Sequence, residues 1–190
     1  NIDTLFPKSV YIKENLLDQK ELHDLETIIR QIYVDTVEYN RTVFQQVNST
    51  HRICDNIHNR EDVVFFLKKL LPCVVDFATR LGYSDKQKSR MTVDNMWFNV
   101  SNEDDYVSIH NHPGSIISGA FYLKAPDGAK IRFLDNPNMI ISPENFTQLS
   151  YEYAQYDCDP NRLLLFKSDF LHGTDRQPAG EKIVISFNIV

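Results

Sequence analysis

The sequence predicts an α+β fold, in which N-terminal helices buttress an antiparallel barrel or sandwich of the jelly-roll kind. Two observations predict it. Apolar residues recur at helical spacing in residues 1–90, and short β-like runs separated by turn residues fill residues 91–190. Helices followed by many short strands are typical of one α+β unit. A chain of 190 residues suits a single domain, so we expect residues 1–190 to share one core.

Two helices are expected in the first part of the chain. Asp18 and Glu21 have the spacing of a capping box at the start of the first helix. Its apolar stripe consists of Leu22, Leu25, Ile28, Ile29 and Ile32. The second helix is expected from about Arg60 to Leu81, with a broad apolar face suited to packing on a sheet. Pro72 should kink this helix or split it in two.

Six strands are expected after the helices, because Val, Ile, Phe, Tyr and Leu fill short runs between Pro, Gly, Asp and Asn turns. These runs are Thr92–Val100, Tyr106–His110, Ser115–Lys124, Lys130–Phe133, Arg162–Lys167 and Ile183–Val190. Two segments lack a clear period. The polar residues 36–59 are long for a connector, and residues 136–158 hold aromatics. Loops of this kind carry specificity on a rigid scaffold.

The composition of the chain indicates which partners it can bind and in which compartment it acts. The net charge is −6, with no dense basic patch, so we expect no binding to duplex nucleic acid. No run approaches 18 apolar residues, so no membrane span is expected. The three cysteines, Cys54, Cys73 and Cys158, have no CxxC spacing, which favours a reducing, cytoplasmic location. The match to an N-glycosylation site at Asn40-Arg41-Thr42 is then a chance match.

His110 and His112 are the first candidate metal ligands. They end an alternating apolar run and stand just before Pro113-Gly114, which breaks the strand. Residues i and i+2 of a strand point to the same face, with Cα atoms about 6–7 Å apart. Both rings can therefore reach one metal at the mouth of a barrel. The alternative is two histidines on a polar strand face, and these two residues alone do not decide between them.

His172 favours the metal site. It follows a buried strand and a short turn, 60 residues after His112. An H-x-H or H-x-D pair on one strand, with a lone His about 50–70 residues later, is the ligand pattern of mononuclear double-stranded β-helix enzymes. Nitrogen and oxygen ligands without thiolate fit a non-haem Fe(II) oxygenase better than a structural zinc site. The other histidines, His23, His51 and His58, are expected at the surface.

Lys182 is the candidate for binding an organic anion. It lies ten residues after His172 and opens the last expected strand. A cation there can meet the distal carboxylate of a dicarboxylate that chelates the iron. The alternative is a surface lysine at the start of a strand, which the three histidines make less favourable.

The chain resembles a family of 2-oxoglutarate/Fe(II)-dependent oxygenases found in marine bacteria and their phages. The most specific part of the resemblance is the H-x-H-P-G-S block at residues 110–115, followed by S-G-x-[FY]-Y at residues 118–122. The other matching pieces are Leu5-Phe6-Pro7, Trp97-Phe98-Asn99, Ile131-Arg132-Phe133-Leu134-Asp135, Leu163–Phe166, Leu171-His172-Gly173 and residues 181–188. Together they span nearly the whole chain.

The resemblance implies a double-stranded β-helix core, cupin-like, with bound Fe(II) and 2-oxoglutarate. It assigns His110 and His172 to the metal and Lys182 to the cosubstrate carboxylate. His112 stands where most such enzymes have Asp or Glu, which would give a three-His site. Lys182 and Val184 stand where an Arg-x-Ser pair is common. Asp135 and Asp169 are further carboxylates that the metal could recruit.

Further residues are expected around the cosubstrate. Asn99 and Tyr122 are candidates for hydrogen bonds to 2-oxoglutarate, and Ser118 is a weaker candidate for lining the same site. Ser115 and Arg132 are weaker candidates as well.

The resulting hypothesis is a dioxygenase that couples decarboxylation of 2-oxoglutarate to hydroxylation of a small-molecule, peptide or protein substrate, with ascorbate as reductant in vitro. If a phage encodes the chain, it would act in the cytoplasm of the host. One alternative is a three-His cupin-like dioxygenase that uses no 2-oxoglutarate. The other is a β-sandwich binding protein without catalysis. The substrate and the oligomeric state are left open.

Overall fold

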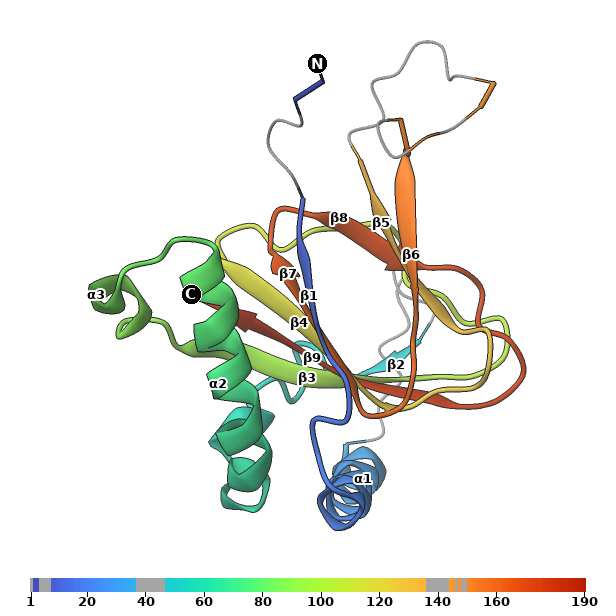
Figure 1. Cartoon of the computed structure of the whole chain (residues 1–190). Coiled ribbons are helices and arrows are strands. Elements are labelled where there is room, and N and C mark those ends of the chain that lie inside the picture. The colour runs from blue at the N-terminus through green and yellow to red at the C-terminus, as the bar shows by residue number, and fades with distance from the viewer. Residues whose placement is uncertain (1, 4–7, 37–46, 136–143, 146, 148–149) are drawn as a thin grey trace.

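In a computed structural model, two antiparallel β-sheets face each other and helices cover the outer side of the larger one (Figure 1). The structure describes residues 2–3, 8–36, 47–135, 144–145, 147 and 150–190. The six-stranded sheet has the order β1-β7-β4-β9-β3-β2, and the three-stranded sheet has the order β6-β5-β8. The predicted α+β architecture with a double-stranded β-helix is confirmed.

The strands of the larger sheet are β1 (Val10–Lys13), β2 (Asn48–Ser49), β3 (Val93–Ser101), β4 (Ile117–Lys124), β7 (Arg162–Lys167) and β9 (Lys182–Ile189). The strands of the smaller sheet are β5 (Lys130–Leu134), β6 (Tyr153–Asp157) and β8 (Leu171–Thr174). All strand pairs within the two sheets are antiparallel. Neighbours in space are therefore often distant in sequence, as for β4 between β7 and β9.

The helices pack on the outer face of the six-stranded sheet. α1 (Gln19–Asp35) begins with the predicted capping box between Asp18 and Glu21. α2 (Val64–Arg80) follows the short 3-10 helices η1 (Ile57–Asn59) and η2 (Glu61–Val63), and α3 (Asp85–Lys88) is one turn long. Apolar side chains of α1, α2 and alternate sheet positions form the main core, including Leu25, Phe66, Phe77, Phe98, Phe121, Ile185 and Phe187. Burial of this area is the main source of stability.

Gly119 shows how closely the larger sheet is packed. It lies opposite Phe187 in the pairing of β4 with β9. A Cβ atom at residue 119 would lie 2.1 Å from Cζ of the Phe187 ring. Only glycine leaves room for this ring at the centre of the core.

The smaller cluster of buried residues lies between the two sheets and includes Ala120, Tyr122, Ile131, Phe133, Leu164, Phe166 and Val184. Strand alternation places these residues on the face opposite the main core. Each long strand of the larger sheet therefore has an apolar outer face and an inner face directed at the second sheet.

Several sequence expectations need correction. Tyr106–His110 is not a regular strand; it contacts β8 through isolated backbone hydrogen bonds, of which Thr174 N–H to Val107 O is 2.9 Å. The Val107 N–H bonds the Thr174 side chain instead of a strand ladder. α2 continues through Pro72 without being split. Strands β1, β2, β6 and β8 were not predicted.

The two segments without a clear period are described only in part. Residues 47–59 contain β2, a turn and η1, and residues 153–157 form β6. Residues 37–46 and 136–143 lie outside the described part, as do Leu5-Phe6-Pro7 and the Asn40-Arg41-Thr42 match. Among the helices that the structure describes, none has the length and apolar character needed to cross a membrane. All three cysteines are free thiols.

Candidate metal centre and cosubstrate cavity

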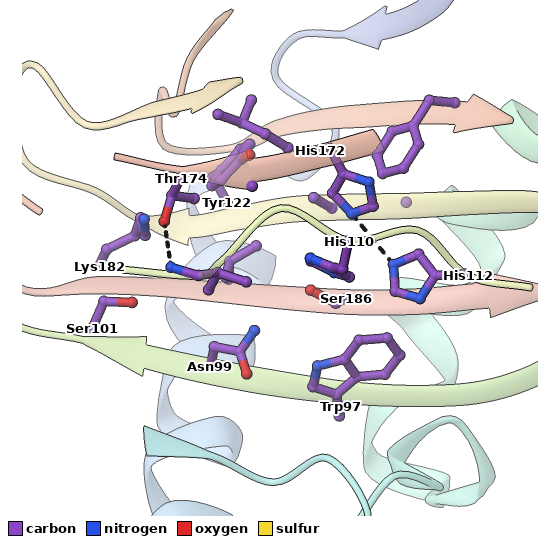
Figure 2. Close-up of a pocket in the computed structure, with 17 residues that line it drawn as sticks. Trp97, Asn99, Ser101, His110, His112, Tyr122, His172, Thr174, Lys182 and Ser186 are labelled. Carbon is purple, nitrogen blue, oxygen red and sulfur yellow. Dashed lines mark hydrogen bonds between the residues drawn. The ribbon is translucent and has the colours of Figure 1, made fainter. Parts of the chain in front are cut away.

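His110, His112 and His172 form one cluster between the two sheets (Figure 2). One ring nitrogen of each residue lies within 4.8 Å of those of the other two. The Nε2 atoms of His112 and His172 are 3.3 Å apart. The structure therefore brings together all three histidines that the sequence singled out, although they are separated by up to 62 residues in the chain.

Backbone hydrogen bonds hold this cluster in place. His110 and His172 exchange both backbone N–H···O bonds, each 2.9 Å long. The His112 N–H donates to Ser168 O at 2.9 Å. Gly173 allows the approach, because a Cβ atom there would lie 2.7 Å from Val107 O and 3.1 Å from Ile109 N. The irregular segment 107–110 can therefore lie directly on β8.

Two of the imidazole rings are oriented by backbone carbonyls. Nδ1 of His110 lies 2.8 Å from Ser108 O, and Nδ1 of His172 lies 2.8 Å from Phe170 O. A carbonyl oxygen only accepts, so each Nδ1 carries the proton and each Nε2 presents its lone pair. This is the arrangement that orients a histidine toward a metal.

The environment keeps the three rings neutral. Burial, and then the neighbouring His110, lower the pKa of His172 to about 3. Burial and the neighbouring His110 and His51 lower the pKa of His112 to about 4. Burial also lowers the pKa of His110. A neutral imidazole is the form that binds a metal ion. The 3.3 Å contact is a hydrogen bond when the neutral His112 carries its proton on Nε2. With that proton on Nδ1, all three Nε2 atoms present lone pairs, and this donor set fits a metal ion.

A cavity extends from the histidines to Lys182, as Figure 2 shows. It is lined by Trp97, Asn99, Ser101, Val107, His110, His112, Gly119, Ala120, Tyr122, Ile131, Phe166, His172, Gly173, Thr174, Lys182, Val184 and Ser186. We call the part beside the histidines the metal end and the part beside Lys182 the cation end. In the described part of the chain, Lys182 is the one charged residue of this lining, histidines aside.

Lys182 is an unusual lysine. Its side chain is only 3% exposed, and burial lowers its pKa, against the opposing effect of Cys158 and Asp105. None of the ion pairs formed among the described residues includes it. A buried ammonium without a paired carboxylate is costly, and an anion in the cavity would relieve that cost.

Strand β3 contributes a row of polar side chains to the cavity. Trp97, Asn99 and Ser101 alternate with buried Met96, Phe98 and Val100 of the main core. Ser101 lies opposite Lys182 in the pairing with β9, and Trp97 lies opposite Ser186. The row therefore runs from the cation end to the metal end. Of these three β3 residues, only Asn99 was predicted to have a role in the site. Because residues i and i+2 of a strand share a face, Trp97 and Ser101 could have been predicted from Asn99.

The other expected cosubstrate residues differ in their placement. Tyr122 lines the cavity, and burial, with Cys158 beside it, raises its pKa far above the ordinary value, so it carries a neutral hydroxyl. Ser118 does not belong to the lining. Its hydroxyl donates to Asn188 Oδ1 at 2.7 Å and lies 2.8 Å from the Ser168 hydroxyl. This places Ser118 in a buried network behind the cavity.

The weaker candidates lie outside the lining. Arg132 pairs with Asp175 at 2.9 Å, and Asp135 pairs with Lys8 at 2.7 Å. Asp169 lies 3.8 Å from the Lys167 ammonium. Ser115 donates its backbone N–H to His112 O. None of these residues belongs to the three-histidine cluster.

His51 was expected at the surface, and the structure places it beside the site. Its ring lies 4.6 Å from the Trp97 ring between centroids. Burial lowers its pKa. The sequence carries no signal for this contact, because it depends on β2 pairing with the end of β3. His23 is exposed, as expected, and His58 is half-buried in η1.

Comparison with known families gives one match. The model of the family described as "Putative 2OG-Fe(II) oxygenase" matches residues 95–188, from β3 to β9. This range contains the three histidines and Lys182. A search of curated protein sequences finds no relative of this chain.

Solved structures share the fold at low sequence identity. The crystal structure of a prolyl-4-hydroxylase from Pseudomonas putida aligns with a TM-score of 0.66 and 11% identity, over 95% of this chain and 92% of that one. A viral collagen prolyl hydroxylase from Paramecium Bursaria Chlorella virus-1, in complex with 2OG, aligns with a TM-score of 0.61 and 14% identity, over 96% of each chain. The non-heme alpha-ketoglutarate-dependent epimerase SnoN from nogalamycin biosynthesis aligns with a TM-score of 0.68 and 10% identity, over 96% of this chain and 76% of the epimerase chain.

Proposed function

Because the chain belongs to the 2OG-Fe(II) oxygenase family, an Fe(II)- and 2-oxoglutarate-dependent oxidoreductase, we propose which of its residues hold the two cofactors. His110, His112 and His172 would bind Fe(II), and Lys182 would bind the distal carboxylate of 2-oxoglutarate. The observation that carries this proposal is the pairing of two features in one cavity. Three convergent imidazoles lie at one end, and a buried ammonium that pairs with no carboxylate of the described residues lies at the other.

The metal end fits Fe(II) through its donor set. Three neutral nitrogen ligands without thiolate suit this ion, and the carbonyls of Ser108 and Phe170 orient two of them. His112 takes the position of the carboxylate common in such enzymes, so the protein contributes no negative charge to the metal. The cosubstrate dianion would then be the source of charge neutralisation at the metal.

The cation end fits a carboxylate. The Lys182 ammonium would form a charge-assisted hydrogen bond with it, and Asn99 and Tyr122 supply further donors on the way to the metal end. When bound, Fe(II) and 2-oxoglutarate supply the oxidising chemistry: O2 is reduced while 2-oxoglutarate loses CO2, and a substrate C–H bond is oxidised. The chain itself would orient both molecules in the cavity between the two sheets.

The substrate class and the compartment are also proposals. A hydroxylase acting on a small molecule or a peptide suits a partly open cavity between the two sheets, and two of the similar structures are prolyl hydroxylases. The acidic net charge of −6 disfavours duplex nucleic acid. The cysteine pattern favours the cytoplasm. The source of the chain in marine bacteria or phages stays a prediction.

Calorimetry with 2-oxoglutarate on the Mn(II)-loaded protein tests the cation end. We expect Lys182→Met to weaken 2-oxoglutarate binding at least about thirtyfold, since it removes a charge-assisted bond in a buried site. Lys124→Met, which removes an ammonium from the protein surface, is the matched control. Equal affinity of Lys182→Met and wild type would contradict the assignment. Millimolar or absent binding of 2-oxoglutarate to the wild type, left unchanged by Lys182→Met, would favour the three-His dioxygenase that uses no 2-oxoglutarate.

Substitution of His112 tests the third ligand. His112→Asp restores a carboxylate and should retain the metal, whereas His112→Ala should weaken metal binding with partial occupancy left. His110→Ala and His172→Ala should weaken metal binding more than His112→Ala does. The metal content of each purified variant, measured after reconstitution with Fe(II), ranks them. Full occupancy and undiminished 2-oxoglutarate turnover in His112→Ala would show that His112 is not a ligand.

A further inference from the structure

Two polar atoms of the β3 row are buried without a hydrogen-bond partner among the residues that the structure describes. They are Nε1 of Trp97, a donor, and Oδ1 of Asn99, an acceptor. The two side chains are 3% and 6% exposed, and both line the cavity. Figure 2 shows them side by side on β3, facing the site. Buried polar groups in native proteins are normally hydrogen-bonded, so this pair points to a molecule that completes it.

The position of the indole is fixed by its neighbours. The His51 ring lies 4.6 Å and the His112 ring 5.9 Å from the Trp97 ring, between centroids. The N–H is thus presented by a side chain that contacts two other rings, which suits a contact that orients a ligand. Trp97 lies at the metal end of the row, where the oxidised bond of a substrate must lie.

2-Oxoglutarate cannot satisfy both atoms. As a dianion it carries only hydrogen-bond acceptors, so it can accept from the Trp97 N–H or from the NH2 group of Asn99. It has no donor for the Asn99 carbonyl. A second molecule with both an acceptor and a donor is needed. Lys182 is the one non-histidine charge of the described lining and is assigned to the cosubstrate, so that second molecule has no charged partner there.

We propose that the primary substrate presents an amide to the β3 row, with its C=O accepting from Trp97 Nε1–H and its N–H donating to Asn99 Oδ1. The assignment rests on the proposed function, because it places 2-oxoglutarate at Lys182. Trp97 and Asn99 are then specificity-determining residues that select an uncharged, amide-bearing group, such as a peptide unit or a carboxamide. A site built to bond an N–H discriminates against an analogue that lacks it, because the buried acceptor is then left unpaired.

The experiment uses the protein loaded with Mn(II) and 2-oxoglutarate. The probes are a panel of N-acetyl amino acid amides that covers the side-chain types, and matched 2-acetoxy acid methyl esters, in which oxygen replaces both amide nitrogens. Affinity is measured by calorimetry. Emission from Trp97, the single tryptophan of the chain, gives a second readout for protein with the native indole. We expect saturable binding of at least one amide, with its matched ester about tenfold weaker.

Two variants connect this difference to the named atoms. Trp97→Phe keeps an aromatic ring and removes only the donor, and it should weaken the amide about fivefold to tenfold. Asn99→Leu removes the acceptor and should abolish the difference between amide and ester. Binding of 2-oxoglutarate is measured first on each protein, so failure of the cosubstrate site is recorded separately from failure of this inference.

Three outcomes would overturn the proposal while 2-oxoglutarate still binds. Equal affinity for amide and ester would show that water satisfies the two atoms. An unchanged amide affinity in Trp97→Phe would exclude the indole N–H as a donor to the ligand. Absence of saturable binding by every amide of the panel would show that the metal end selects another chemistry.

Discussion

The two faces of strand β9 differ in almost every property, although they belong to the same eight residues. Toward the helices it presents Ile183, Ile185, Phe187 and Ile189, all part of the main core. The opposite face carries Lys182, Val184, Ser186 and Asn188, of which the first three line the cavity. The outer face gains stability from apolar burial, and the inner face keeps polar groups at a cost to stability. Stability and chemistry are thus separated by strand alternation alone, and each face can be altered to test that separation.

The largest effect is expected on the inner face. His172→Ala removes a proposed metal ligand whose ring is oriented by Phe170 O. Affinity for Mn(II) should fall about a thousandfold, which corresponds to about 4 kcal/mol. The thermal midpoint of the metal-free protein should change little, since His172 is outside the main core. Metal titration measures the Mn(II) affinity, and calorimetric unfolding measures the thermal midpoint. A large loss of metal-free stability would show that the two faces are not independent.

The next effect is expected on the outer face. Gly119→Ala forces a Cβ atom against the Phe187 ring and should cost about 2–3 kcal/mol in the free energy of unfolding. Phe187→Leu shortens that side chain and should recover part of the loss when combined with Gly119→Ala. Urea unfolding of the two single variants and the double variant gives the coupling energy. Additive effects would mean that the ring is not what excludes a side chain at residue 119.

A smaller effect is expected where β8 meets segment 107–110. Gly173→Ala places a Cβ atom against backbone atoms of Val107 and Ile109, so the segment that carries His110 must shift. We expect about tenfold weaker Mn(II) binding, or about 1.4 kcal/mol. Gly128→Ala, at a turn with open space around it but a positive φ of 81°, is the control for loss of a glycine. It should leave metal affinity unchanged, and a matching loss there would remove the geometric explanation.

The smallest effect concerns the contact of the helices with β9. Glu181 accepts hydrogen bonds from Arg30 of α1 at 2.6 Å and from Lys124 at 3.1 Å. The Arg30 guanidinium, more than the opposing effect of burial, lowers the pKa of Glu181. A carboxyl with a lowered pKa stabilises the fold above its unfolded pKa, and this stabilisation is lost as the pH falls through its folded value.

Glu181→Gln should therefore reduce the free energy of unfolding by less than about 1 kcal/mol at pH 7, since the partners are partly exposed. The difference from wild type should shrink as the pH falls below the ordinary pKa of a glutamate and through the lowered pKa of the folded carboxyl, where the wild-type side chain takes up its proton. Urea unfolding at a series of pH values measures it. A difference that stays constant down to pH 3 would show that the ion pair does not contribute.

The fold was predictable where one face of an element is apolar. The capping box of Asp18 and the stripe of α1 follow from local rules, and each of the long strands β3, β4 and β9 carries apolar residues that face the main core. The short strands β1, β2, β6 and β8 were missed because they have two to five residues, and their pairing partners, not their own sequence, define them. The irregular path of residues 106–110 depends on the close approach to Gly173, a contact far away in sequence.

The residues of the site were predictable from their types and spacing in the sequence, although the strand expected to carry His110 is absent from the described structure. His110, His112, His172 and Lys182 all face one cavity, as the sequence suggested. Ser118 could not be placed from its neighbours in sequence, because its partners Ser168 and Asn188 are 50 and 70 residues away. The contact of His51 with Trp97 was equally out of reach, since it requires the pairing of β2 with β3.

The buried Lys182 ammonium has a consequence for protein turnover. Burial disfavours its charge until an anion joins it, so the proposed binding of 2-oxoglutarate at Lys182 would link occupancy of the cavity to folding. A cosubstrate at a hundred times its dissociation constant adds about 2.7 kcal/mol to stability. The unfolded fraction, on which cellular proteases act, then falls about a hundredfold. The abundance of this enzyme in the cell is therefore expected to rise with the supply of its own cosubstrate.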